Sequence, residues 1–269
     1  MKIKNILYSF LLVVIFANIS LAQDIISAAE AKKLLNSKTT VLVSTRKATD
    51  YAKVHIKNAV NISVTNLAST TEPKGIIKSP TELATILGEK GINPAKKVII
   101  YDSGSNKSAG RLYWTLKYLG FEDVKILDGH MKAWRTARGP VTGAATKTVA
   151  TPFTPKVNSK VFADKAYVKS KLNSAVIIDV RDDTEWGAGH IQNAKHLEFK
   201  NVLTDGGKLK SKAELQALFD AAGITKNKEI ILYCATSVRA GVVFLALSSI
   251  LEYPNVKVYD GAYNEWKLN

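Results

Sequence analysis

Short apolar runs alternate with longer segments of helical spacing along most of the chain. Residues 97–101, 124–127 and 256–259 are apolar runs with the length of buried strands. Residues 109–119 and 211–221 place apolar side chains at the spacing of one helix face. Strands that alternate with helices favour α/β domains, in which a mainly parallel sheet is covered by helices on both faces. We therefore predict the α/β fold class.

The pattern occurs twice. The segment DYAKVHIKNA around His55 corresponds to EWGAGHIQNA around His190, and DGHMKAW at residues 128–134 corresponds to DGAYNEW at residues 260–266. The segment between the copies is rich in Gly, Pro, Thr and Ala and shows no periodicity, which is typical of a linker. The sequence thus predicts two tandem copies of one domain, at residues 23–138 and 156–269, joined by a linker at residues 139–155.

The first 22 residues have a different composition from the rest. Lys2 and Lys4 precede an almost wholly apolar run at residues 6–19, and Ser20-Leu21-Ala22 places small residues where signal peptidase cleaves. We predict a signal peptide at residues 1–22 and an exported, periplasmic protein. An uncleaved membrane anchor is the alternative, although the apolar run is short for a membrane span. No later stretch is long enough to cross a membrane, so no stable anchor is expected after cleavage.

Composition and charge favour a globular protein that binds small anions and give no support for nucleic-acid binding. The chain is 46% hydrophobic and 23% charged, which is typical of a globular protein. Its formal net charge of +15 favours small anionic substrates. Because the basic residues form no cluster interleaved with aromatic residues, a nucleic-acid partner is not expected.

The only cysteine, Cys234, lies in the most informative stretch of the chain. An apolar run at residues 230–233 precedes it, and a small loop that ends at Arg239 leads into an apolar segment of helical spacing. Strand, tight loop and helix start together form an anion site, at which a thiolate nucleophile is favoured. A lone cysteine after an apolar strand is also often a small buried hydrophobe. In an exported protein it cannot form an internal disulfide, so it is either buried or used.

Three motifs in fixed order resemble the tandem rhodanese family of sulfurtransferases. In the second copy they are DVRDDTEWGAGHIQNA (179–194), YCATSVRAG (233–241) and DGAYNEW (260–266). In the first copy the counterparts are TRKATDYAKVHIKNA (45–59), YDSGSNKSAG (101–110) and DGHMKAW (128–134). Alignment of the two copies places Asp102 opposite Cys234. The resemblance therefore implies two rhodanese-like domains, of which the first lacks the nucleophile and serves to form the cleft.

The resemblance also implies a double-displacement mechanism. The Cys234 thiolate takes a sulfane sulfur from a small anionic donor and becomes a persulfide. Cyanide or a thiol then accepts the sulfur, and a redox protein is one candidate for the thiol. Backbone N–H groups of the loop and the charge of Arg239 would stabilise the anions. No cofactor or metal is implied. The expected donor-binding residues are Arg181, Arg239, Ala235, Thr236, Ser237, Val238 and Ala240.

Two further residues are expected to support the site. Asp179 would orient Arg181 or its loop, and His190 would have a structural role because His55 occupies the same place in the copy without a nucleophile. For Arg181 the alternative to donor binding is a salt bridge with a nearby acid. Ser237 departs from the resemblance, because many family loops have glycine there. If φ is positive at that position, serine is the poorer fit.

The donor and the reaction class leave alternatives. We expect thiosulfate as the donor because the loop ends in Arg239, with 3-mercaptopyruvate as the alternative because Ala235 and Thr236 pair a small residue with a hydroxyl. A phosphatase of the Cdc25 type, which has the same fold, is disfavoured because four residues rather than five separate Cys234 from Arg239. An alternative of another class is a sulfur carrier or binding module without small-molecule turnover.

Overall fold

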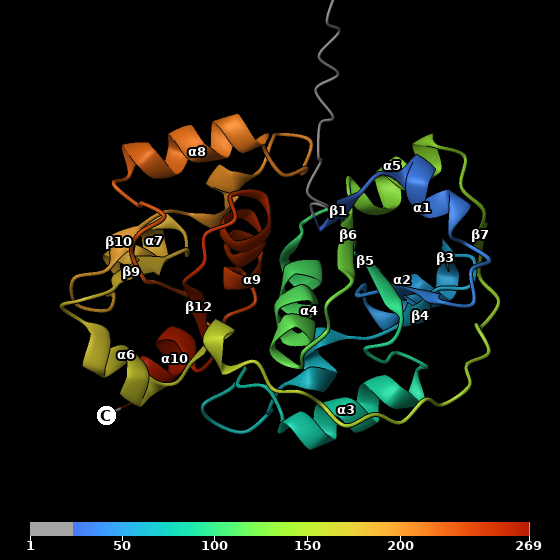
Figure 1. Cartoon of the computed structure of the whole chain (residues 1–269), viewed down its shortest axis with the longest axis horizontal. Helices are drawn as coiled ribbons and strands as arrows, with labels where there is room; N and C mark the ends of the chain where they lie inside the picture. Colours follow the sequence, from blue (N-terminus) through green and yellow to red (C-terminus); the bar gives the residue numbers. More distant parts are fainter. Residues whose placement is uncertain (1–23, 269) are drawn as a thin grey trace, which may run out of the picture.

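The computed structural model describes residues 24–268, so the predicted signal peptide at residues 1–22 lies outside the described residues. Figure 1 shows two α/β domains that lie side by side. Within the described range, no helix combines the length and the apolar character needed to cross a membrane.

The N-terminal domain is built on a five-stranded sheet in which all strand pairs are parallel. In spatial order its strands are β1 (Ile25–Ile26), β6 (Val124–Leu127), β5 (Lys97–Tyr101), β2 (Thr40–Ser44) and β4 (Val60–Asn61). Its helices are α1 (Ala28–Lys33), α2 (Ala48–Lys53), α3 (Pro80–Glu89), α4 (Lys107–Tyr118) and α5 (His130–Thr136), with a 3-10 turn at Val64–Leu67.

The C-terminal domain repeats this arrangement strand for strand. From the corresponding edge, its parallel sheet contains β8 (Phe162–Ala163), β12 (Val256–Tyr259), β11 (Ile230–Tyr233), β9 (Val176–Asp179) and β10 (Lys195–His196). Its helices are α6 (Lys165–Lys171), α7 (Asp183–Gly187), α8 (Lys212–Ala221), α9 (Ala240–Leu245) and α10 (Ala262–Trp266). Two 3-10 turns (Ser159–Val161, Phe199–Val202) and a π-helical turn after α9 (Ala246–Ile250) complete it. The predicted repeat and the α/β fold class are confirmed.

The segment predicted as a linker contains one short strand. β7 (Val141–Thr142) pairs antiparallel with β3 (His55–Ile56) of the N-terminal domain. Farther along, the Thr151 N–H donates to the Gly88 carbonyl at 2.9 Å. The segment therefore runs along the surface of the first domain, and two-residue strands of this kind leave no periodicity for a sequence pattern to show.

The two domains share one apolar core. A single cluster of buried side chains includes Val43 and Ile100 from the first sheet and Ile178 and Leu232 from the second. Between the sheets, α4 and α9 pack against each other at the centre of the molecule (Figure 1). Because the interface is an extension of both cores, it holds the domains in one fixed arrangement.

A pair of equivalent glycines allows α4 and α9 to approach closely. A Cβ atom added at Gly241 would lie 2.3 Å from the Gly110 carbonyl oxygen, and one added at Gly110 would lie 2.7 Å from the Val242 nitrogen. Both contacts are with backbone atoms, which cannot move aside without separating the helices. The repeated "Ala-Gly" in the two loop motifs is therefore explained by helix packing.

We expect Gly241→Ala to lower the free energy of unfolding by about 1–3 kcal/mol, because the added methyl group overpacks the crossing. Gly187→Ala is the matched control, since a Cβ atom at Gly187 meets no atom within 4 Å and alanine favours the helix. Urea denaturation of both variants measures the difference. Equal stabilities for the two variants would show that the contact between α4 and α9 does not require glycine at position 241.

Candidate active site

Cys234 follows β11, the central strand of its sheet, at the carboxyl end where ligands bind in parallel α/β folds. The first amides of α10 hold the start of the loop: Tyr263 N–H donates to the Cys234 carbonyl at 2.9 Å, and Asn264 N–H to the Ala235 carbonyl at 3.2 Å. The Cys234 residue is only 1% exposed. The thiol is therefore buried beneath the loop.

The loop around Cys234 presents backbone donors. Within the described part of the chain, the N–H groups of Ala235, Thr236, Ser237 and Val238 donate to no protein acceptor. Ala240 is buried at the start of α9. An anion at the centre of such a loop can be stabilised by several N–H groups at once.

In the first domain, the corresponding loop donates backbone N–H groups to a carboxylate. Its loop carries Asp102 in the place of Cys234, and the Asp102 carboxylate accepts the Gly104 N–H at 2.6 Å and the Ala109 N–H at 3.5 Å. That loop is one residue longer, because eight positions separate Asp102 from Gly110 and seven separate Cys234 from Gly241. In the first copy the loop therefore surrounds a carboxylate, and the second copy has Cys234 in the corresponding place.

Ser237 has the backbone conformation that favours glycine. Its φ is 57°, and Asn106 in the first-domain loop has a φ of 60°. The Ser237 side chain is buried and its hydroxyl donates to the Tyr259 carbonyl. This hydrogen bond offsets part of the strain and turns the side chain away from the donor site. The predicted donor-binding role of Ser237 is therefore limited to its backbone N–H.

Two substitutions separate strain from hydrogen bonding at Ser237. Ser237→Ala keeps the strained φ and loses the hydrogen bond, so we expect a loss of about 1–2 kcal/mol in the free energy of unfolding. Ser237→Gly loses the same bond but relieves the strain, so its stability should lie within about 1 kcal/mol of the wild type. Thermal or urea denaturation ranks the two. A glycine variant less stable than the alanine variant would contradict this account.

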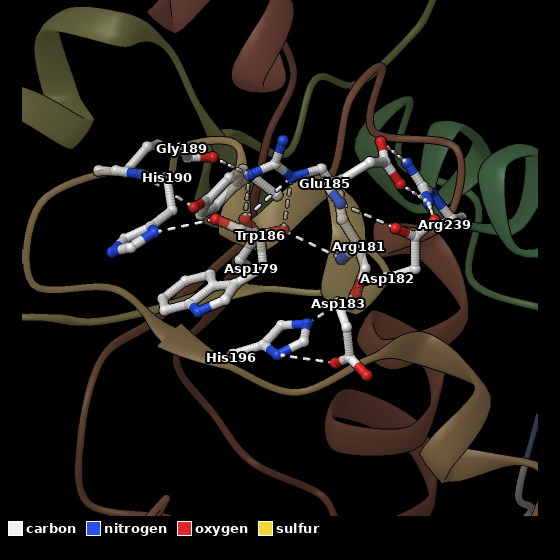
Figure 2. Close-up of polar contacts among 12 residues, drawn as sticks. Asp179, Arg181, Asp182, Asp183, Glu185, Trp186, Gly189, His190, His196 and Arg239 are labelled. Atoms are coloured by element: carbon white, nitrogen blue, oxygen red, sulfur yellow. Dashed lines mark hydrogen bonds and ion pairs between the residues drawn. The ribbon is translucent and has the colours of Figure 1, made fainter.

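Arg239 lies beside the nucleophile but is bound by acids. Its guanidinium forms a two-pronged ion pair with Glu185, Nη2 to Oε1 at 2.8 Å and Nη1 to Oε2 at 2.5 Å, and Asp182 lies 3.8 Å away (Figure 2). Glu185, and then Cys234, raises the pKa of Arg239 above its ordinary value, against the effect of burial. Arg239 therefore places a positive charge beside Cys234, and Glu185 balances that charge.

Arg181 is held by a carboxylate, a backbone carbonyl and an aromatic ring. The residue is 3% exposed, and its Nε lies 2.9 Å from both carboxylate oxygens of Asp179 (Figure 2). Its Nη2 donates to the Gly189 carbonyl at 2.6 Å, and its guanidinium stacks 4.0 Å from the Tyr263 ring. The structure shows the ion pair with Asp179, and the donor-binding role of Arg181 stays a prediction. The ion pair with Asp179, which was the alternative, fixes the strand end next to the α10 start.

His190 has the same environment as its counterpart in the first domain. Its ring stacks on Trp186 at 3.6 Å and its Nδ1 lies 3.2 Å from the Trp186 carbonyl. His55 stacks on Tyr51 at 3.8 Å, with Nδ1 2.8 Å from the Tyr51 carbonyl. Because the contact recurs where no nucleophile exists, the geometry agrees with a structural role.

A cavity of about 380 Å³ opens between the domains next to the loop. Thr236 and Val238 line it from the loop. The N-terminal domain lines the rest with Val64, Thr65, Ala68, Ser69, Thr70, Lys74, Gly75 and Arg111. A Cβ atom on Gly75 would lie 2.8 Å from the Thr236 Cβ, so residues 69–76, called the strap below, touch the loop directly. Sequence reasoning missed these residues; the polar stretch at 70–78 was the available signal.

The fold and this loop define a class: a tandem α/β protein in which a single cysteine lies in a loop with unpaired backbone N–H groups at the domain interface. Residues 27–137 and 164–269 each match the family described as "Rhodanese-like domain". The chain belongs to this family, with two copies of the domain.

Characterised relatives cover most of the chain. It is 33% identical over 233 residues to the 3-mercaptopyruvate sulfurtransferase of Escherichia coli K12, covering 81% of this chain and 82% of the relative. It is 27% identical over 254 residues to the thiosulfate sulfurtransferase of Pseudomonas aeruginosa, covering 90% and 93%. The crystal structure of SseA, a 3-mercaptopyruvate enzyme of E. coli, superposes with a TM-score of 0.83 at 29% identity, covering 90% of this chain and 99% of SseA. Sulfurtransferase activity fits all three.

Proposed function

We propose that this sulfurtransferase carries sulfur as a persulfide on Cys234. The observation that supports the proposal most strongly is the ring of unused N–H donors from Ala235 to Val238, set against the first domain, where the same loop surrounds the Asp102 carboxylate. A thiolate and a persulfide are both anions, so the loop stabilises the state before and the state after the first transfer.

The reaction balances in two displacements. The Cys234 thiolate attacks the outer sulfur of thiosulfate or the thiol sulfur of 3-mercaptopyruvate, and an S–S bond forms. The bond between that sulfur and the rest of the donor breaks, and its electron pair leaves as sulfite or as the enolate of pyruvate. The thiol proton of 3-mercaptopyruvate passes to the enolate, which becomes pyruvate. An acceptor such as cyanide or a thiolate then attacks the outer sulfur, the S–S bond breaks, and the Cys234 thiolate is restored. No oxidant or reductant is consumed in either step.

We propose 3-mercaptopyruvate as the preferred donor. Glu185 already neutralises Arg239, which was the residue that favoured thiosulfate. The remaining loop face offers small side chains and the Thr236 hydroxyl next to a cavity large enough for a three-carbon acid. Thiosulfate, a compact dianion, would need more unpaired positive charge close to the sulfur.

Steady-state kinetics with cyanide as acceptor tests the donor. We expect kcat/KM for 3-mercaptopyruvate to exceed that for thiosulfate by about tenfold or more, a difference of about 1.4 kcal/mol in transition-state binding. Equal values, or a higher value for thiosulfate, would contradict the donor proposal. Loading of Cys234 without turnover by either cyanide or a thiol would instead support the sulfur-carrier alternative.

We also propose that the protein works outside the cytoplasm. The basic start, the apolar run at residues 6–19 and the small residues before position 23 support cleavage after Ala22. N-terminal sequencing of protein purified from the producing cell tests this proposal. A mature protein that still begins at Met1 would contradict it.

A further inference from the structure

Arg111 connects the N-terminal domain to the catalytic half of the molecule. It lies on α4, is 2% exposed, and its Nη2 donates to Asp260 Oδ1 at 2.7 Å and to the Gly75 carbonyl at 2.8 Å. Asp260 in turn accepts the Ile77 N–H at 2.9 Å. The guanidinium is therefore held where the strap, α4 and the residues before α10 meet.

One side of this guanidinium is unused. Within the described residues, Arg111 Nη1 is buried and has no hydrogen-bond partner. A buried donor without an acceptor costs free energy, so such a group calls for an explanation. Trp114 stacks 4.7 Å from the guanidinium, which limits its movement towards other acceptors.

The unused donor belongs to a residue of the interdomain cavity. Arg111 lines the cavity together with Thr236 and Val238 of the catalytic loop, and Lys74 lies at its exposed side. Both terminal nitrogens of Arg239 donate to Glu185, whereas only Nη2 of Arg111 has a partner among the described residues. Because Asp260 balances the charge of Arg111, Nη1 offers a carboxylate a directed hydrogen bond and not a net positive charge.

We propose that Arg111 is a specificity-determining residue of the N-terminal domain, and that its Nη1 donates to the carboxylate of the sulfur donor bound in the cavity. The inference rests on the proposed function. Arg111 would thus give the N-terminal domain a direct part in donor recognition. It would have no part in the discharge of the persulfide, because cyanide has no carboxylate for Arg111 to bind.

The test uses Arg111→Lys in the full chain. Lysine keeps a cation for Asp260, but it has a single nitrogen and so lacks the second terminal nitrogen that would donate to the carboxylate. The matched control is Arg135→Lys, at an exposed arginine on α5. We expect KM for 3-mercaptopyruvate to rise by about tenfold or more in Arg111→Lys, as for loss of a hydrogen bond to a charged group. The rate at which cyanide discharges a preloaded persulfide should stay at the wild-type value, and Arg135→Lys should match the wild type in both.

Three results would overturn the inference. The first is a KM for 3-mercaptopyruvate in Arg111→Lys within about twofold of the wild type. The second is an equal fall in the rates of donor loading and persulfide discharge in Arg111→Lys. The third is an equal affinity for pyruvate in Cys234→Ser and in the double variant Cys234→Ser with Arg111→Lys. The last comparison, made by calorimetry, does not depend on turnover. A wild-type protein that loads sulfur from neither donor would contradict the proposed function itself, and is distinguished by measuring the wild type first.

Discussion

Cys234→Ser is expected to reduce sulfur transfer by on the order of 10⁴-fold or more, to the uncatalysed background. The reason is chemical: the hydroxyl oxygen cannot form a persulfide, and no other thiol exists in the chain. Because serine is nearly isosteric and the loop N–H groups can hydrogen-bond to its oxygen, the fold should be retained. Turnover with cyanide, measured for both donors, gives the loss.

A matched variant separates chemistry from folding. Cys234→Ala also removes the nucleophile but adds no polar atom at a position that is 1% exposed. Both variants should therefore be inactive and should melt within a few degrees of the wild type, corresponding to about 1 kcal/mol. Residual activity above background in either one would show that the reaction does not pass through Cys234.

Asp260→Ala is expected to lower the free energy of unfolding by about 3–5 kcal/mol, the largest effect on stability that we predict. Asp260 is 2% exposed and forms the ion pair with Arg111 across the domain interface. Its removal leaves the Arg111 charge buried without a partner and the Ile77 N–H without an acceptor. Urea denaturation measures the loss.

The double variant Arg111→Met with Asp260→Ala is the control for this effect. Since both charges are then absent, the penalty for a buried unpaired cation disappears, and the double variant should be more stable than Asp260→Ala alone. If the loss of stability in the double variant equals the sum of the losses in Arg111→Met and Asp260→Ala, the ion pair is not the source of the stability. The interface then depends on other contacts.

The fold followed from the sequence because its signals are local and repeated. Buried strands such as Lys97–Tyr101 and Val256–Tyr259 were predicted with their observed bounds. The predicted helix at residues 211–221 is α8, which Ser211 caps: its hydroxyl accepts the Glu214 N–H at 3.3 Å. The π-helical turn after α9 was not predicted, because its apolar pattern continues that of the helix.

The candidate site was only partly predictable. The place of Cys234 follows from strand, loop and repeat, which are properties of neighbouring residues. The positive φ at Ser237 was raised only as a condition, because many loops of the family have glycine there. The pairing of Arg181 and Arg239 with acids was harder to foresee, because a sequence places several carboxylates near each arginine without showing which side chain each one faces. The contribution of Arg111 depends on how two domains pack, and no local pattern carries that information.

The mass of the intact protein tests the central claim most directly. Protein incubated with 3-mercaptopyruvate, and separately with thiosulfate, is freed of donor and weighed before and after cyanide is added, alongside Cys234→Ser. The account predicts a gain of one sulfur atom that maps to Cys234, disappears with cyanide and is absent from the variant. No gain from either donor, or the same gain in Cys234→Ser, would contradict a persulfide on Cys234.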